Sequence, residues 1–163
     1  MNSSDLIGPD EFQGETIWLK VARKALSFDD VISFLGDDRA GGVVLFSGNV
    51  RNHSEGRDGV DSLEYEGYEE QLVPSFLKIA NEAMSRFEGV LKVAIHHRLG
   101  LCALGESSVI IGVSSEHRES GFVASKFCID TLKQTSPIWK KEHWSNGSDW
   151  ALGANVVTQF EEL

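Results

Sequence analysis

Hydrophobic residues alternate with polar ones along parts of the chain and recur every three or four positions in others. Alternation and short apolar runs predict strands over residues 15–21, 41–51, 62–68, 91–100 and 107–115. Helical spacing predicts helices over residues 27–36, 69–88 and 116–134. A short extended segment is expected over 136–144. The resulting order, β-α-β-β-α-β-β-α-β, predicts an α+β fold with a mixed sheet.

The expected helices carry end signals. Ser27 is a candidate N-cap of the first helix, and Gly36 lies just beyond its last apolar residue. Gly89 is a candidate C-cap of the second helix. Ser114 or Ser115 is the expected N-cap of the third.

Polar and glycine-rich stretches predict the connections. Residues 52–62 are expected to form a loop and residues 145–150 a turn. Residues 1–14 and the last few residues are expected to be loosely ordered. Because no linker or repeat interrupts the pattern, residues 1–163 are expected to form one domain.

Charge narrows the function classes. The chain has 15 Lys and Arg against 25 Asp and Glu, a formal net charge of −10, which argues against nucleic-acid binding. No apolar run approaches the roughly 20 residues that span a bilayer. The polar N-terminus does not resemble a signal peptide, and Cys102 and Cys128 lie in apolar segments. We therefore expect a soluble cytoplasmic protein with reduced core thiols and no metal site.

Basic residues nevertheless gather in one segment. Between His117 and Trp144 there are five Lys and Arg against three acids, which gives this segment +2 in an acidic chain. His117 and Arg118 are expected in the first turn of the third helix, where an anion could bind the free backbone N–H groups. Alternatively, both side chains point outward and pair with Glu116 or Glu119.

Two lysines in this segment have no obvious acidic partner. Lys133 lies in the last helical turn without an acid four residues away, whereas Lys126 has Asp130 to pair with. Lys140 and Lys141 must face opposite ways on an extended segment, so one of them faces the core or a cleft. A half-buried lysine has a lowered pKa, which suits it to proton transfer. Otherwise, Lys133 simply compensates the helix dipole.

Arg51 follows a buried strand at the start of a loop, a common place for a binding group, although a surface ion pair is the plainer interpretation. His96 and His97 lie on opposite faces of a strand and cannot share a metal. The residues alone therefore predict an anion pocket built from Arg51, His117, Arg118, Lys133 and Lys140. A binding module without chemistry and a phosphoesterase using His117 and Lys140 both remain open.

Five motifs, in this order and spacing, carry a family resemblance: VLFSGNVRNH, LEYEGY, HHRLG, VSSEHRESGF and IDTLKQTSPIWKKE. Together they closely resemble the large, catalytic subunit of molybdopterin synthase, the MoaE-type family. The resemblance covers about residues 41–145, and the segments outside it match loosely.

The resemblance implies an enzyme of molybdenum cofactor biosynthesis with an α/β hammerhead-like fold, including a small antiparallel subdomain. This sulfurtransferase converts cyclic pyranopterin monophosphate (precursor Z) to molybdopterin. Two sulfurs come from the C-terminal Gly-Gly thiocarboxylate of a small ubiquitin-like subunit. The family forms a heterotetramer around a dimer of large subunits, and it requires neither a metal nor an organic cofactor.

The resemblance also assigns residues. Lys133 and Lys140 match the catalytic lysines, with Lys133 meeting the thiocarboxylate and Lys140 assisting proton transfer. The residues that it implies for binding the pterin and its cyclic phosphate are Asn49, Val50, Arg51, His117, Arg118, Lys133, Lys140, Lys141 and Glu142. Asn49 stands where relatives often carry Lys or Thr, so this position offers a hydrogen bond in place of a charge.

Overall fold

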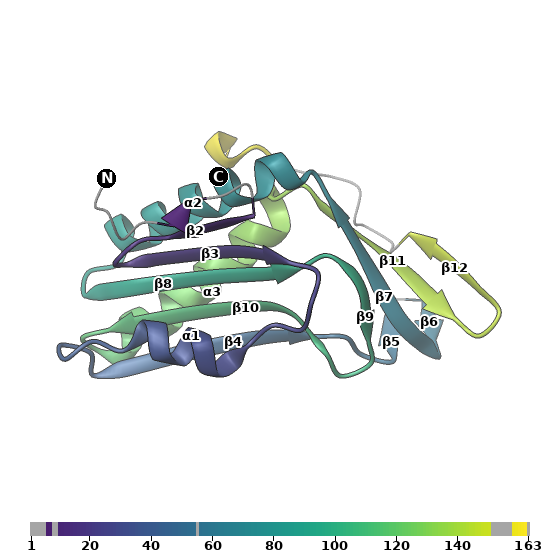
Figure 1. Cartoon of the computed structure of the whole chain (residues 1–163), viewed down its shortest axis with the longest axis horizontal. Coiled ribbons are helices and arrows are strands. Elements are labelled where there is room, and N and C mark those ends of the chain that lie inside the picture. The colour runs from purple at the N-terminus through teal and green to yellow at the C-terminus, as the bar shows by residue number, and fades with distance from the viewer. Residues whose placement is uncertain (1–5, 8–9, 55, 151–157, 163) are drawn as a thin grey trace.

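A mixed six-stranded sheet forms the centre of the computed structural model, which describes residues 6–7, 10–54, 56–150 and 158–162 (Figure 1). In spatial order its strands are β1 (Leu6–Ile7), β2 (Glu11–Gln13), β3 (Ile17–Ala22), β8 (Val90–Arg98), β10 (Ser107–Ser115) and β4 (Gly42–Asn49). Strands β3 and β8 pair in parallel, and the other neighbours pair antiparallel. The predicted α+β class with a mixed sheet is confirmed.

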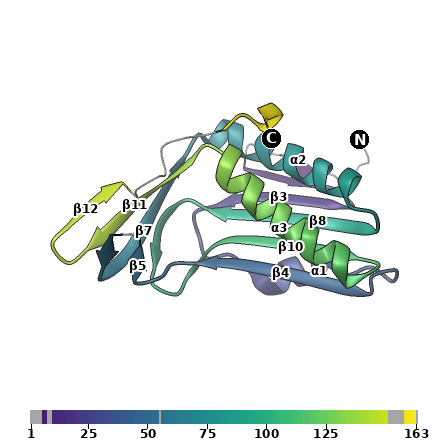
Figure 2. The same ribbon diagram turned by 180° about the vertical axis from the view of Figure 1, so that it is seen from behind.

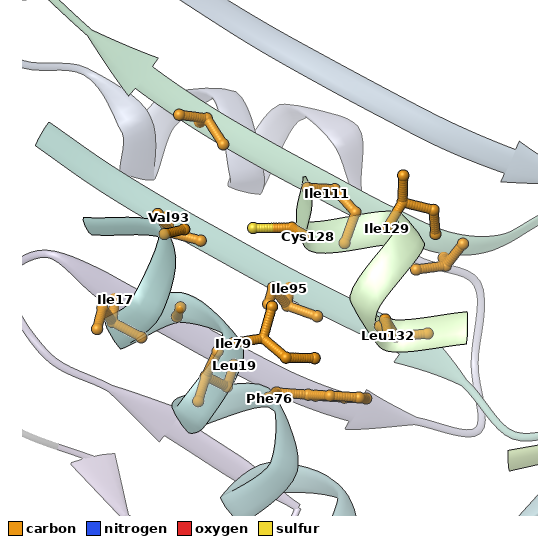
Figure 3. Packing of buried hydrophobic residues seen from close by; sticks show 14 of the residues in the cluster. Ile17, Leu19, Phe76, Ile79, Val93, Ile95, Ile111, Cys128, Ile129 and Leu132 are labelled. Carbon is orange, nitrogen blue, oxygen red and sulfur yellow. The ribbon is translucent and has the colours of Figure 1, made fainter. Parts of the chain in front are cut away.

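Two long helices cover one face of this sheet, and a short helix covers part of the other (Figures 1 and 2). The long helices are α2 (Glu69–Arg86) and α3 (Arg118–Thr135), and the short one is α1 (Phe28–Leu35). Alternate strand residues such as Leu19 and Ile95 meet Phe76 of α2 and Leu132 of α3 in the main core (Figure 3). This burial fixes the direction of α3 and hence the position of its last turn.

A smaller antiparallel sheet lies at one end of the large one (Figure 1). Its strands, in spatial order, are β12 (Gly147–Trp150), β11 (Ile138–Trp144), β7 (Val60–Gly67) and β9 (Gly100–Ala103). Val50, Val60, Leu63 and Cys102 form a separate buried cluster here. The antiparallel subdomain expected from the resemblance is therefore present.

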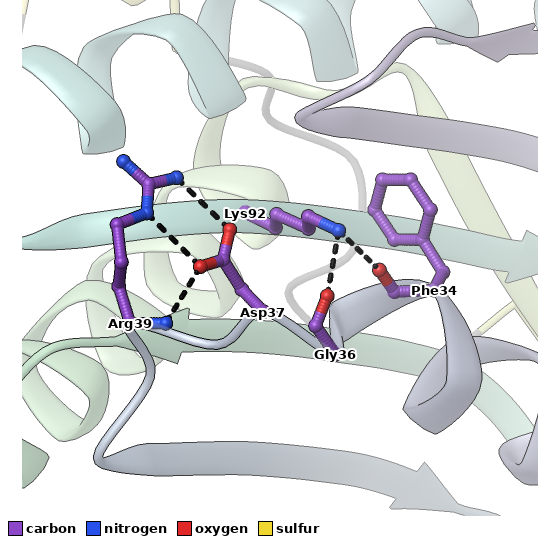
Figure 4. Close-up of polar contacts among 5 residues, drawn as sticks. All are labelled: Phe34, Gly36, Asp37, Arg39 and Lys92. Carbon is purple, nitrogen blue, oxygen red and sulfur yellow. Dashed lines mark hydrogen bonds and ion pairs between the residues drawn. The ribbon is translucent and has the colours of Figure 1, made fainter.

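Helix α1 is held at both ends. The Ser27 side chain accepts a hydrogen bond from the backbone N–H of Asp30, which confirms the predicted N-cap. At the other end, Nζ of Lys92 donates to the carbonyl oxygens of Phe34 and Gly36 at 3.2 and 2.7 Å (Figure 4). A cation at these carbonyls also complements the negative C-terminal end of the helix dipole.

Several local predictions were wrong. Part of the predicted lead-in forms β1 and β2, which add two antiparallel strands to the large sheet, while residues 1–5 and 8–9 lie outside the described residues. Residues 52–62 include the hairpin of β5 (His53–Ser54) and β6 (Arg57–Asp58) and the start of β7. Backbone pairing overrode the turn-forming composition of these segments.

Two later segments, residues 147–150 and 160–162, were also more structured than predicted. Strand β12 occupies most of the turn expected over 145–150. Near the C-terminus, Phe160 begins a short 3₁₀ helix (Phe160–Glu162) and packs against the main core. Partial burial of the Phe160 ring explains why these residues form a helical turn.

Both cysteines are unpaired and buried, as predicted. The Cys128 thiol lies in the main core (Figure 3), where burial raises its pKa to about 12. It is therefore a packing group and not a nucleophile. Among the described residues, no helix is both long enough and apolar enough to span a bilayer.

Candidate active site

A cavity of about 550 Å³ opens where the two sheets meet the end of α3. Its wall includes residues from β4, β7, β11 and α3 and from the β5–β6 hairpin. The polar side chains expected from sequence that line it are Asn49, Arg51, Lys133, Lys140 and Glu142. Of the residues predicted for the site, three basic side chains and one carboxylate, that of Glu142, therefore line the same cavity.

The chain reverses between the two lysines. Lys133 lies in the last turn of α3, which ends where the N–H of Ser136 bonds to the carbonyl of Leu132 at 3.0 Å. After Pro137 the chain returns as β11, which pairs with β7 so that Lys140 lies opposite Tyr65. The helix end and the strand therefore bring both lysines to one cavity, as the sequence predicted.

Lys140 lies half-buried in this cavity. Burial is the largest cause that lowers its pKa, and the charge of Lys133 lowers it further. Arg51 acts in the same direction, while Glu142 raises the pKa. Burial and the neighbouring cations thus make Lys140 a better proton donor than an ordinary lysine, and a base once it is deprotonated.

Glu142 is almost completely buried, with 2% of its surface exposed. It lies two residues after Lys140 on β11, so the alternation of the strand points both side chains to the same side. The hydroxyl of Ser54, on β5, donates a hydrogen bond to Oε2 of Glu142. Sequence reasoning missed Ser54, because residues 52–62 offered no strand pattern.

Part of the cavity wall is apolar and aromatic. It includes Tyr65 and Trp139 together with the ring of His97, which meets Tyr65 edge-on at 5.3 Å. Burial lowers the pKa of His97 to about 4, so its ring is neutral near pH 7. Because Nδ1 lies 2.7 Å from the carbonyl oxygen of Arg98, it must carry the proton as donor, which leaves Nε2 an acceptor. His97 was predicted to be structural, and no local pattern linked it to the pocket.

Two predicted binding residues lie outside this cavity. Lys141 faces the other side of β11, with Nζ 5.9 Å from the ring centre of Trp150. Val50 is buried beneath the cavity, and its N–H and carbonyl oxygen bond to Glu106 and Gly105 at 3.0 and 2.8 Å. Their placement gives Val50 a supporting position and Lys141 a position on the opposite face.

His117 and Arg118 also lie away from the cavity of their own chain. His117 occupies the N-cap position of α3 without a side-chain capping bond, and the Ser115 hydroxyl donates to its carbonyl oxygen at 2.6 Å. The predicted serine cap is therefore wrong. Arg118 and Lys133 are separated by about 22 Å along the helix, at 1.5 Å per residue. One chain does not form the predicted five-residue pocket.

A second cavity, of about 470 Å³, lies beside α1 over β3 and β8. Its wall has as many acidic as basic side chains, and Arg23 pairs with Glu69. Within the described ranges, no three His, Cys, Asp or Glu side chains are grouped to hold a metal. Excess positive charge therefore distinguishes the first cavity as the candidate site.

Comparison with known proteins tests the resemblance. A sequence model described as MoaE protein matches residues 21–135, most of the chain. A protein named molybdopterin synthase catalytic subunit from Nostoc sp. is 42% identical over 79% of each chain. The molybdopterin synthase catalytic subunit 1 of Mycobacterium tuberculosis is 38% identical over 85% of this chain and 92% of its own.

Solved structures agree in fold. The molybdopterin synthase structure from Staphylococcus aureus superposes with a TM-score of 0.77 and 29% identity, covering 85% of this chain and 98% of that one. A MoaE protein from Burkholderia ambifaria gives 0.68 at 29% identity, covering 83% and 88%. The resemblance inferred from the five motifs is thereby confirmed, and the chain belongs to the MoaE protein family, an enzyme family whose relatives are named molybdopterin synthase catalytic subunits.

Proposed function

We propose that this protein is a sulfurtransferase that converts cyclic pyranopterin monophosphate (precursor Z) to molybdopterin. The observation that carries the proposal is the meeting of Lys133 and Lys140 at one cavity, with Arg51 and the buried Glu142 beside them. Family membership supports the overall reaction, and the residue roles come from this arrangement.

The cavity suits chemistry in which the nucleophile arrives with a partner. A thiocarboxylate is already nucleophilic, so the enzyme needs no activated cysteine or serine of its own. It needs cations where negative charge develops, at the acyl carbon and at the opening cyclic phosphate. Lys133, Lys140 and Arg51 provide fixed positive charge at such a site.

The two lysines take different roles because their surroundings differ. Lys133 is exposed at the rim and meets the incoming thiocarboxylate tail. Lys140 lies deeper, and its lowered pKa suits it to give a proton to the substrate and to take one back. Glu142 remains close enough to favour the charged form of Lys140.

The pterin binds against the apolar wall. A flat heterocycle can stack on or pack beside Tyr65, while the Nε2 acceptor of His97 is available for a pterin N–H. Arg51 and Asn49 lie on the polar side, where they bind the cyclic phosphate through charge and a hydrogen bond.

The sulfur donor is a small ubiquitin-like subunit whose Gly-Gly tail ends in the thiocarboxylate. A solved complex of subunits 1 and 2 of the molybdopterin-converting factor from Helicobacter pylori has a similar fold, with a TM-score of 0.69 at 23% identity. An extended tail without bulky side chains is suited to reach into the cavity beside the exposed Lys133. The two unpaired cysteines fit a reaction in the cytoplasm.

A dimer of large subunits gives His117, Arg118 and Lys141 their proposed place. Because His117 and Arg118 lie about 22 Å along α3 from Lys133, they bind the phosphate only if they belong to a second copy of the chain. Lys141, on the outer face of β11, is also placed to act across such an interface. The assembly is then a heterotetramer with one small subunit at each end.

Reconstitution tests the proposal. Purified protein, thiocarboxylated small subunit and precursor Z are expected to yield molybdopterin, detected as its fluorescent oxidation product. Binding of the small subunit without turnover, under conditions in which a known molybdopterin synthase is active, would instead support a non-catalytic binding module. Mixed dimers, one copy carrying Arg118→Ala and the other Lys133→Ala, are expected to retain about half the wild-type sites if the two residues act across the interface.

A further inference from the structure

The β5–β6 hairpin contacts the candidate site through β5 and the β11–β12 strand pair through β6. On β5, the Ser54 hydroxyl donates to the buried carboxylate of Glu142. On β6, Arg57 lies directly opposite Ser54 in the hairpin pairing. A two-stranded hairpin of four paired residues is too small to be stable alone, so its position depends on what it contacts.

Arg57 anchors the hairpin to the neighbouring strands β11 and β12. Its guanidinium lies 4.4 Å from the ring centre of Trp144 on β11, and Nη2 lies 3.3 Å from a carboxylate oxygen of Asp149 on β12. The Arg57 side chain is only 21% exposed, so the stacking interaction is partly desolvated and stronger than one in open water. The anchor therefore holds the hairpin against the β11–β12 pair.

Glu142 needs a hydrogen-bond donor because it is 2% exposed. A buried carboxylate that loses its donor tends to move toward another one, and such a movement takes its negative charge away from Lys140. The hydrogen bond from Ser54 holds the carboxylate in place. Lys140 shares the same face of β11 and the same cavity.

We propose that Ser54 is a positioning residue for the reaction, that it acts through Glu142 on Lys140, and that Arg57 holds it there by clamping the hairpin onto Trp144. This inference rests on the proposed function for its effect on rate. Its effect on Lys140 does not depend on that function. It also gives Trp144 a role beyond packing, since the ring is the surface on which Arg57 rests.

The charge balance around Lys140 sets the direction of the effect. The titratable and charged side chains that share its cavity come from the segment after β4, from β5, β7, β8, α3 and β11: Arg51, His53, Tyr65, His97, Lys133 and Glu142. Glu142 raises the pKa of Lys140, while Lys133 and Arg51 lower it. Weakening the carboxylate therefore moves the pKa of Lys140 further down.

The experiment measures that pKa directly, by carbon-13 NMR of the lysine side chain, in wild type, Ser54→Ala and Ser54→Thr. We expect a lower pKa of Lys140 in Ser54→Ala and recovery in Ser54→Thr, which keeps the hydroxyl. Arg57→Met is expected to shift the pKa in the same direction. Asp58→Asn, on the exposed end of the same hairpin, is the matched control and leaves it unchanged.

Activity provides the second readout. In the reconstituted reaction, Ser54→Ala is expected to lower kcat about tenfold, with little change in KM, because misplacing a catalytic group by about 1 Å can cost up to about a hundredfold in rate. The basic limb of the pH–rate profile shifts down with the pKa of Lys140. An unchanged or raised pKa of Lys140 in Ser54→Ala, with the fold intact by NMR, overturns the inference. Failure of the wild-type reaction would overturn the proposed function and leave the NMR result valid.

Discussion

Lys133 and Lys140 belong to different elements, yet they share one cavity, where burial and then the charge of Lys133 lower the pKa of Lys140. The last turn of α3 holds the first, and β11 holds the second after the chain reverses at Pro137. Like charges are brought together in a folded protein where an anion is to be bound or formed between them. Substitution of these two lysines is therefore the most direct test of the proposed site.

Lys133→Ala is expected to reduce molybdopterin formation at least a hundredfold, because it removes the cation beside the developing oxyanion, and one such group contributes about 100- to 1,000-fold. The side chain is exposed, so the fold is expected to survive. Product formation in single-turnover reactions measures the loss, and circular dichroism checks the fold.

Lys126→Ala is the matched control for that variant. Lys126 lies two turns earlier on the same helix and pairs with Asp130 at the surface. Exposed pairs of this kind contribute little to stability, so activity and fold should both stay close to wild type. Full activity in Lys133→Ala, or an equal loss in both variants, would contradict the role given to Lys133.

The sequence predicted this lysine pair through one local rule and the family resemblance. Alternation on an extended segment separates Lys140 from Lys141, and the resemblance matches Lys133 and Lys140 to the catalytic lysines. The same kind of rule, a rise of 1.5 Å per residue, also implies that Arg118 lies far from Lys133 on one straight helix. The predicted five-residue pocket ignored that length, and the structure accordingly does not form it within one chain.

Other parts of the site could not be predicted from local pattern. Ser54, Tyr65 and His97 come from three strands whose pairing depends on contacts between distant residues, and no spacing in the sequence links them. The β5–β6 hairpin is rich in residues typical of turns, so only its contacts with β11 and β12 make it a strand pair. The α1 helix, in contrast, carries its own cap and its own apolar face, and it was predicted within a residue at each end.

Stability is expected to fall as the pH is lowered from 7 to 5. Burial lowers the pKa of His96 to about 3 and that of His97 to about 4, whereas an unfolded histidine titrates near 6.5. Below pH 6.5 the unfolded chain therefore binds protons that the folded chain does not, and folding stability declines. Each histidine is expected to cost about 2 kcal/mol between pH 7 and 5. Urea denaturation at several pH values measures the slope, and His96→Asn should make it shallower.

Lys92→Met tests the C-terminal anchor of α1. The ammonium donates to two carbonyl oxygens at the end of the helix, at 3.2 and 2.7 Å (Figure 4). Its loss leaves both acceptors without this donor, and we expect a cost of about 1–3 kcal/mol in the free energy of unfolding. Chemical denaturation measures it. Arg39→Met, which breaks the neighbouring pair with Asp37, is the control and should cost less, because the Arg39 side chain is 66% exposed.

Lys140→Met is expected to abolish most activity and to increase stability. Burial and the charges of Lys133 and Arg51 lower the pKa of Lys140, which means that the folded state disfavours its charged form more than the unfolded state does. Below the folded pKa the folded chain carries that full penalty, and above it the ammonium deprotonates and the penalty shrinks. The stability gained by Lys140→Met should therefore be largest near neutral pH and should diminish as the pH rises toward 10.5. Lys140→Arg keeps the charge and should gain no stability, so parallel urea denaturation curves of the two variants separate the loss of charge from the loss of packing. Equal stability of both variants at every pH would contradict this account of Lys140.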